Sequence, residues 1–183
     1  GDYHTAQILA MHNITADRNI TGHGMMYESV GNLVLTFPHK QSSDYRRQLS
    51  LDEAVATTTY CTQGVCYERK TITSLADDVT LVKLKSDKKG QLDFNVSFVG
   101  PLKKQRVTAK VYQAGRDMLR VFSHPTATNA ENVPNALHCV TYIKVMPTGG
   151  SVTGSNGNVS VNGADEALIV ISSATNFLRY DCV

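Results

Sequence analysis

Tryptophan is absent from the 183-residue chain, and aromatic residues make up only 7% of it. Sugar-binding modules often present a flat aromatic ring to the C–H face of a sugar, so this scarcity argues against such a module. The tyrosines remain as possible stacking platforms, although on strands they more commonly pair across the sheet or are partly buried. These tyrosines are Tyr27, Tyr45, Tyr60, Tyr67, Tyr112 and Tyr142.

The chain also lacks a long apolar run and a strong charge excess. No segment approaches the roughly 20 apolar residues of a membrane-spanning helix, and no signal peptide is visible. The formal net charge is +2, and the cations between Lys83 and Lys110 alternate with apolar residues, which predicts a solvated sheet face. We therefore expect neither nucleic acid nor a membrane as a partner. Gly1 is interpreted as a remnant of tag removal, so a targeting segment can have been cut away.

Recognisable catalytic and metal-binding patterns are missing too. The cysteines and histidines lack the paired spacing of a zinc site, and no nucleophile elbow, phosphate loop or dinucleotide fingerprint occurs. Hydrolysis of a glycosidic bond needs two carboxyl groups across a cleft. The acidic pairs here are sequence neighbours, which point to opposite faces of a strand, so turn or strand-end roles are predicted. The pairs are Asp52-Glu53, Asp77-Asp78 and Asp165-Glu166. We predict no catalytic residue, no metal ligand and no cofactor, and we assign no substrate-binding residue.

One pair of cysteines has an informative spacing. Cys61 and Cys66 flank a segment in which Gln63 and Gly64 can form a two-residue hairpin turn, because glycine tolerates a positive φ. Such a turn places the two cysteines opposite each other, with Cβ atoms about 4.5–5.5 Å apart. This separation is close to that of a disulfide. A disulfide between Cys61 and Cys66 is therefore a hypothesis, with a modest effect on stability because the loop is short.

What the chain does contain is a series of short segments with a two-residue period. Residues 3–11 are predicted to form one short helix, and from residue 26 apolar and polar residues alternate. About ten strands separated by glycine-rich or polar turns, without helices between them, predict an all-β, two-sheet antiparallel sandwich. We expect an N-terminal segment over residues 1–25 and one β-sandwich domain over residues 26–183. The glycine-rich stretch 151–157 is interpreted as a hairpin tip. The predicted strands are 33–37, 45–51, 56–62, 65–74, 79–85, 91–99, 107–113, 118–123, 137–146, 158–162 and 167–173.

Several pieces of the chain are informative when they are taken together and in order. They are 27–37 (YESVGNLVLTF), 45–52 (YRRQLSLD), 54–56 (AVA), Tyr60, 64–69 (GVCYER), Gly149-Gly150, 163–167 (GADEA) and 174–177 (ATNF). Together these pieces resemble the N-terminal domain of glycoside hydrolase family 95, the inverting α-L-fucosidases. The resemblance covers residues 27 to about 177.

This resemblance implies a β-sandwich of the supersandwich type. In the family, a helical linker joins that domain to an (α/α)6 barrel, which holds the general acid and the residues that activate water. The usual front segment, with a tryptophan and a Leu-Pro-x-Gly-Asn-Gly-like stretch, has no counterpart before Tyr27. No catalytic residue of the family therefore maps onto this sequence. A missing front can also leave a sheet edge open, which would favour a dimer or a partner strand.

Three hypotheses follow. The first is a non-catalytic N-terminal domain of an α-L-fucosidase-like hydrolase, whose partner is the helical barrel of the parent protein. The second is a free-standing carbohydrate-binding module for fucosylated glycans, which rests on the fold alone. The third is a structural or interaction protein without its barrel. Because bacterial glycan-degrading enzymes of this type are commonly exported, the resemblance implies a periplasmic or extracellular location.

Overall fold

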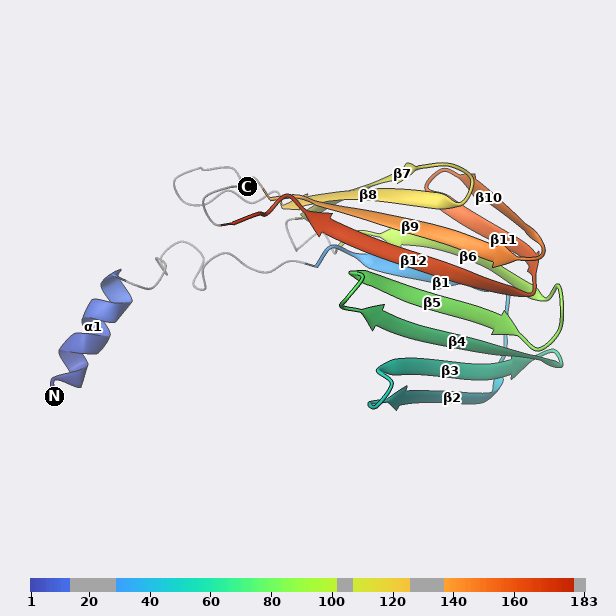
Figure 1. Cartoon of the computed structure of the whole chain (residues 1–183), viewed down its shortest axis with the longest axis horizontal. Coiled ribbons are helices and arrows are strands. Elements are labelled where there is room, and N and C mark those ends of the chain that lie inside the picture. Colours follow the sequence, from blue (N-terminus) through green and yellow to red (C-terminus); the bar gives the residue numbers. More distant parts are fainter. Residues whose placement is uncertain (14–28, 102–106, 126–136, 180–183) are drawn as a thin grey trace.

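The computed structural model describes residues 1–13, 29–101, 107–125 and 137–179, and it confirms the predicted all-β class (Figure 1). One helix, α1 (Tyr3–Asn13), precedes the strands. The first six strands are β1 (Asn32–Thr36), β2 (Ser43–Ser50), β3 (Val55–Thr62), β4 (Val65–Ser74), β5 (Val79–Ser86) and β6 (Leu92–Val99). The next six are β7 (Val107–Gln113), β8 (Met118–Pro125), β9 (Cys139–Thr148), β10 (Ser151–Ser155), β11 (Asn158–Ala164) and β12 (Glu166–Thr175).

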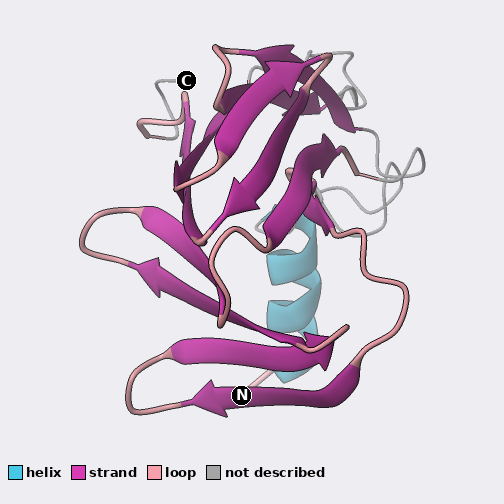
Figure 2. Ribbon diagram, turned by 90° about the vertical axis from the view of Figure 1, so that its right-hand side faces the viewer, coloured by secondary structure: helices cyan, strands magenta, loops and turns pink. Residues whose placement is uncertain are grey.

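The strands form two antiparallel sheets of unequal width. The large sheet has eight strands in the order β2-β3-β4-β5-β12-β9-β8-β7, and the small sheet has four in the order β1-β6-β11-β10. The small sheet packs over only part of the large one, mainly through β6 against β5 and β11 against β8 and β9. Figures 1 and 2 show β2, β3 and β4 extending beyond the small sheet.

The core lies where the two sheets overlap. Alternate residues of β6 face inward, as the period-two pattern predicts, and Leu92, Phe94 and Val96 are almost completely buried. From the large sheet, Ile143 and Ile169 meet them with no exposed surface. Branched aliphatic side chains therefore fill the space between the sheets, which is the usual basis of a sandwich.

One predicted hairpin tip is instead a strand. Residues 151–157 are predicted to be a short hairpin tip, yet β10 spans Ser151–Ser155 and pairs with β11, and the tip of this hairpin is confined to Asn156 and Gly157. The composition hid this strand because it contains Gly154 and few large apolar residues. A Cβ atom at Gly154 would lie 2.8 Å from the carbonyl oxygens of Gly115 and Arg116. The glycine is therefore needed for the close approach of β10 to the β7–β8 turn.

Three chain crossings between the sheets meet at one end of the sandwich, and Asp165 joins them. Its backbone N–H donates to the carbonyl oxygen of Thr148 at 2.9 Å, and its own carbonyl accepts from the N–H of Ser86 at 3.3 Å. The side-chain Oδ1 accepts from the N–H of Gly90 at 2.7 Å. The predicted turn role of Asp165 is thereby confirmed.

The helix α1 begins at an aspartate cap. Asp2 Oδ1 accepts from the backbone N–H of Thr5 at 3.1 Å, which satisfies one of the free amides at the helix start. The helix extends two residues beyond the predicted end at Met11. Among the described residues, no helix has the length and apolar character needed to cross a membrane.

Candidate functional site

The inner face of β2, β3 and β4, which we call the overhang, changes character along a single row of paired residues. Leu84 of β5 pairs with Arg69 of β4, Arg69 with Thr58 of β3, and Thr58 with Arg47 of β2, so the four side chains share one face. Leu84 is in the core, Thr58 is still buried, Arg69 is half-buried and Arg47 is exposed. The overhang therefore continues the core face of the sheet as a polar and cationic surface.

An aromatic cluster lies where the segment between β1 and β2 crosses the overhang. The His39 ring packs against Tyr67, with ring centroids 4.4 Å apart, and Tyr67 stacks on Tyr60 at 5.4 Å. His39 Nδ1 is hydrogen-bonded to the hydroxyl of Tyr60 at 2.9 Å. Tyr67 donates its hydroxyl proton to the carbonyl oxygen of Gln91 at 3.0 Å. These contacts hold the chain between the two sheets against the strands β3 and β4.

The protonation states of the cluster follow from its partial burial. Burial lowers the pKa of His39, while the Asp93 carboxylate opposes this shift. Burial also raises the pKa of Tyr60, assisted by Tyr67 and opposed by the guanidinium of Arg69. For Tyr67, burial again raises the pKa, with smaller contributions in the same direction from Asp93 and Asp87. At neutral pH the cluster therefore contains a neutral imidazole and two protonated tyrosines.

A pocket of about 360 Å³ opens beside the cluster. Its cationic groups are Lys40 and Arg69, and none of the described residues that line it carries a carboxylate. The Tyr45 side chain stands at the pocket and is 58% exposed, so one ring is accessible to solvent. The lining residues are Leu35, Phe37, His39, Lys40, Gln41, Ser42, Tyr45, Thr58, Tyr60 and Arg69. The pocket thus combines positive charge, hydroxyl and amide groups, and an exposed aromatic ring.

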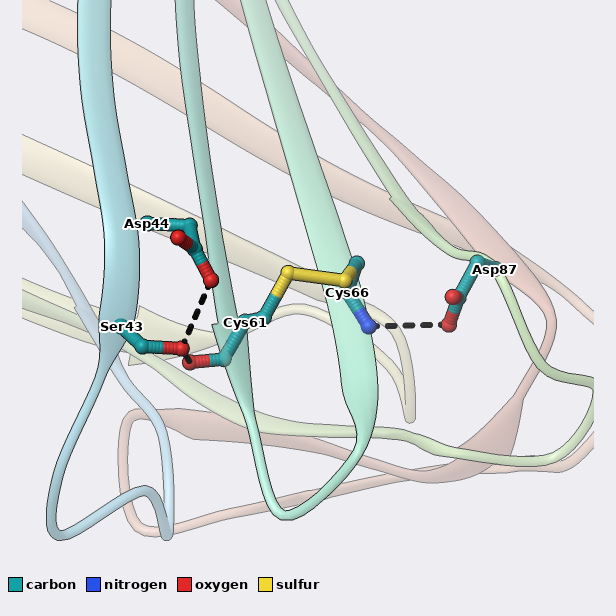
Figure 3. Close-up of a disulfide and its surroundings, with 5 residues drawn as sticks. All are labelled: Ser43, Asp44, Cys61, Cys66 and Asp87. Carbon is teal, nitrogen blue, oxygen red and sulfur yellow. Dashed lines mark hydrogen bonds between the residues drawn. A yellow bond between two sulfur atoms is a disulfide. The ribbon is translucent and has the colours of Figure 1, made fainter.

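Behind the cluster, on the opposite face of β3 and β4, lies the disulfide Cys61–Cys66 (Figure 3). Cys61 pairs with Cys66 and Thr62 with Val65, which confirms the predicted hairpin register, and the turn residues Gln63 and Gly64 both have positive φ. The Cα atoms of the cysteines are 4.0 Å apart. The oxidation of this pair in solution stays a prediction that mass measurement tests.

Neighbouring side chains fix the two strands that carry the disulfide. Asp87 Oδ1 accepts from the backbone N–H of Cys66 at 2.9 Å. Ser43 Oγ donates to Asp44 Oδ2 at 3.0 Å and lies 3.4 Å from the carbonyl oxygen of Cys61 (Figure 3). These contacts link β2 and the β5–β6 turn to the hairpin that bears Tyr60 and Tyr67.

The acidic pairs are distributed over separate turns. Asp52-Glu53 lies in the β2–β3 turn and Asp77-Asp78 in the β4–β5 turn. Asp77 Oδ2 accepts from Ser74 Oγ at 2.7 Å, and Glu166 pairs with Lys83 at 3.2 Å. Among the described residues, no group of three potential metal-ligating side chains comes together. The acidic pairs therefore have the turn and strand-end roles that the sequence predicts.

The tyrosines fall into different environments. Tyr60 and Tyr67 pair across strands, as tyrosines on strands commonly do, and Tyr27 lies outside the described residues. Tyr45 is exposed on the overhang, whereas Tyr112 and Tyr142 are exposed on the outer face of the large sheet. Tyr112 also carries the guanidinium of Arg120 over its ring, 5.0 Å from the centroid.

Sequence reasoning missed the two residues that give the pocket its chemistry. His39 follows the proline that ends the first strand, and nothing local connects it with tyrosines more than 20 positions away. Arg69 lies within a predicted strand, and the sequence does not distinguish it from the many cations expected on the surface. The only signal available was the resemblance, whose pieces include Tyr60 and Arg69.

Fold and site together define a β-sandwich in which the described acidic pairs occupy separate turns. The chain belongs to the family described as "Glycosyl hydrolase family 65, N-terminal domain", which it matches over residues 1–180. It is therefore an N-terminal β-sandwich domain of a glycoside hydrolase family.

Two similar proteins can be compared with this chain. The chain is 31% identical over 170 residues to "Alpha-L-fucosidase 2" of Arabidopsis thaliana, covering 83% of this chain and 20% of that relative. This relative confirms the resemblance to family 95. A solved chain described as "Putative kojibiose phosphorylase from human microbiome" is 10% identical, with a TM-score of 0.49, over 78% of this chain and 22% of the other. The chain thus spans about a fifth of each of these proteins.

Proposed function

We propose that this chain is a non-catalytic N-terminal domain of an α-L-fucosidase-like hydrolase, in which it supports a helical (α/α)6 catalytic barrel. The 31% identity with an α-L-fucosidase supports the activity of the parent protein. The turn positions of the acidic pairs support the placement of the chemistry outside the sandwich. In this proposal residues 26–183 form the sandwich and residues 1–25 a preceding segment with its helix.

The observation that carries this proposal is the apolar outer face of the large sheet. Tyr142, Met146 and Ile72 are 44%, 41% and 36% exposed there, although the outer face of a solvated sheet is normally polar. Leu168 of β12 pairs with Met146. Val170, the next residue of β12 on the same face, pairs with Leu81, which in turn pairs with Ile72, so these residues form one patch across β4, β5, β12 and β9. The patch supports a packed partner.

The catalytic barrel is the partner proposed for this patch. The chain matches only one fifth of the fucosidase, so the remainder of such a protein supplies a large domain of the same polypeptide. Lys144 lies between Tyr142 and Met146 on β9, and Lys83 pairs with Leu168, so two cations lie within the patch. Both are already paired, with Asp117 and Glu166 respectively, so the apolar side chains are the groups that still lack a partner. Domain interfaces of this kind combine an apolar centre with a polar rim.

The catalytic assignment is tested with the purified chain and an aryl α-L-fucoside. We expect no hydrolysis, because the catalytic groups are assigned to the barrel. Turnover that copurifies with the chain through several steps, and that disappears on unfolding, would contradict the proposal.

The docking surface is tested in the full-length hydrolase. Met146→Asp should lower its thermal stability and its fucosidase activity, because a charge would be buried at the interface. Lys110→Asp, on the outer face of the edge strand β7 and two strands away from β9, is the matched control. Equal effects of both substitutions would show that the patch is not the interface.

The location of the protein belongs to the same proposal. We propose an exported, periplasmic or extracellular protein, and the disulfide geometry at Cys61 and Cys66 supports an oxidising compartment. Mass measurement of protein isolated from its native source, alkylated with and without reduction, tests this. A fully reduced native pair would count against export.

A further inference from the structure

The pocket on the overhang has an excess of positive charge that the described protein does not neutralise. The ion pairs of the described residues join Lys70 to Glu68, Lys83 to Glu166 and Lys144 to Asp117. None of these pairs includes Arg47 or Arg69. Arg69 is half-buried against Thr58, Tyr60 and Leu84, so its charge is partly removed from water. Its chain neighbour Glu68 points to the opposite face of β4 and is paired with Lys70. An anion in the pocket would supply the missing partner.

Two cations line the pocket, and a third lies beside it. Lys40 comes from the segment between β1 and β2 and Arg69 from β4. Arg47 of β2 is not part of the lining, but it lies on the same face of the sheet, where it pairs with the lining residue Thr58. His39, at the same pocket, is kept neutral at neutral pH by its partial burial. The guanidinium of Arg69 can bind a carboxylate or a sulfate with two parallel hydrogen bonds. The charge of the pocket is therefore complementary to a single anionic group.

The remaining lining fits a saccharide that carries this group. Gln41, Ser42 and Thr58 offer amide and hydroxyl groups, which can exchange hydrogen bonds with sugar hydroxyls. Tyr45 offers an exposed ring for the C–H face of a sugar. The volume of about 360 Å³ lies within the range typical of pockets for small ligands. An acidic peptide would use the cations but has less need for this ring and these hydroxyls.

We infer that the overhang pocket lined by Lys40, Arg69 and Tyr45, with Arg47 beside it, is a binding site for an acidic saccharide, held through its carboxylate or sulfate. The site lies on the inner face of the large sheet, whereas the patch proposed for the barrel lies on the outer face. Binding therefore does not depend on the proposed docking, and the domain can hold an anionic glycan while the barrel is in place.

Nuclear magnetic resonance titration of the 183-residue chain tests this inference. The probes are trigalacturonate, its neutral counterpart galactotriose, and galactose 6-sulfate, which separates carboxylate from sulfate recognition. We expect saturable shifts of the amides of β2, β3 and β4 with an anionic sugar, and affinity for galactotriose weaker by roughly tenfold or more. Equal binding of galactotriose, or no binding of either anionic probe at millimolar concentration, would overturn the site.

Matched variants separate a specific site from general charge. Arg69→Gln and Arg47→Gln should each weaken trigalacturonate binding by roughly five- to tenfold. Arg46→Gln should leave it unchanged, because Arg46 is the next residue on β2 and lies on the opposite face. Arg47 and Arg46 are both exposed strand residues, so this pair remains informative even if Arg69→Gln perturbs folding.

Two further outcomes would overturn the inference. Equal weakening by Arg46→Gln and Arg47→Gln would indicate diffuse electrostatic attraction. The second outcome is that hexaglutamate binds as tightly as trigalacturonate and that Tyr45→Ala changes neither affinity. This result would indicate a surface for acidic peptides. Tyr45→Ala is expected to weaken saccharide binding alone.

Discussion

The part of the large sheet that the small sheet covers, which we call the covered half, and the overhang belong to one continuous hydrogen-bonded sheet. Their inward-facing side chains differ in burial. In the covered half, inward residues such as Leu119, Val145 and Ile169 have no exposed surface. In the overhang, the corresponding positions hold Arg47 and Tyr45, which are largely exposed. The small sheet covers only the first of these halves, and this coverage accounts for the difference. Apart from one register shift between Ser43 and Arg46 of β2, the strand pairing is regular in both halves.

This contrast separates the source of stability from the surface available for recognition. Burial of aliphatic side chains supplies most of the folding free energy of a sandwich. The overhang, which buries less, is held by its ladder, by the Cys61–Cys66 link and by the His39 cluster. Such a region can expose charged groups and aromatic rings to solvent, because its side chains are not needed to fill the core.

The largest expected contrast concerns two leucines. Leu119→Ala, in the covered half, should lower the free energy of unfolding by about 2–5 kcal/mol, because it leaves a cavity among fully buried neighbours. Leu49→Ala, on the overhang, should change it by less than about 0.5 kcal/mol, because this side chain is 62% exposed. Equilibrium unfolding in urea measures both. A large cost at Leu49 would mean that the overhang is covered in solution.

Two glycines give the next contrast. Gly150 has φ +63° at a crossing between the sheets, and a Cβ there would collide with the backbone of Asn162 and Gly163. Gly150→Ala should therefore cost at least roughly 2 kcal/mol, measured by thermal unfolding. A Cβ at Gly64, which has φ +74° in the overhang hairpin, would approach only the end of the flexible Lys88 side chain, at 4.0 Å. Gly64→Ala should cost only about 1 kcal/mol, from backbone strain alone.

The strands and their local pairing could be predicted because their causes are local. Alternation in β6 marked Leu92, Phe94 and Val96 as core residues, and Gln63-Gly64 marked the turn that sets the β3–β4 register. The strand β10 was missed because close backbone approach, rather than apolar packing, selects Gly154.

The overhang could not be predicted, since coverage by another sheet depends on contacts between distant segments. On β2, Tyr45, Arg47 and Leu49 alternate with Arg46 and Gln48, and neither face is clearly apolar. The meeting of His39 with Tyr60 and Tyr67 likewise depends on the path of the chain between the sheets. The position of a pocket therefore needed the tertiary structure.

The disulfide should stabilise the overhang by a smaller amount. Replacing both Cys61 and Cys66 by serine should lower the free energy of unfolding by roughly 2 kcal/mol or less, because the closed loop is short. Amide hydrogen exchange should rise mainly in β3 and β4, while β9 and β12 keep the protection of the covered core. A uniform rise across both halves would show that the overhang and the core unfold as one unit.

The smallest expected effect is the pH dependence conferred by His39. Burial lowers its pKa below the ordinary value of 6.5, against the opposing Asp93 carboxylate. Below pH 6.5 the unfolded chain therefore binds more protons than the folded chain, and the stabilisation is lost as the pH falls from there through the depressed folded value. His39→Gln should flatten this part of the stability profile, measured by urea unfolding at several pH values.

The cause of this shift can be separated from the hydrogen bond that His39 makes. Tyr60→Phe removes the contact with Nδ1 but keeps an aromatic ring at this position, so the pKa of His39 should stay below its ordinary value. Titration of the His39 ring protons by magnetic resonance measures it directly. A pKa at or above 6.5 in the unmodified chain would mean that water reaches the imidazole freely. The aromatic cluster would then be as accessible to water as the rest of the overhang. The boundary between the exposed overhang and the covered half of the large sheet would lie one strand closer to the core.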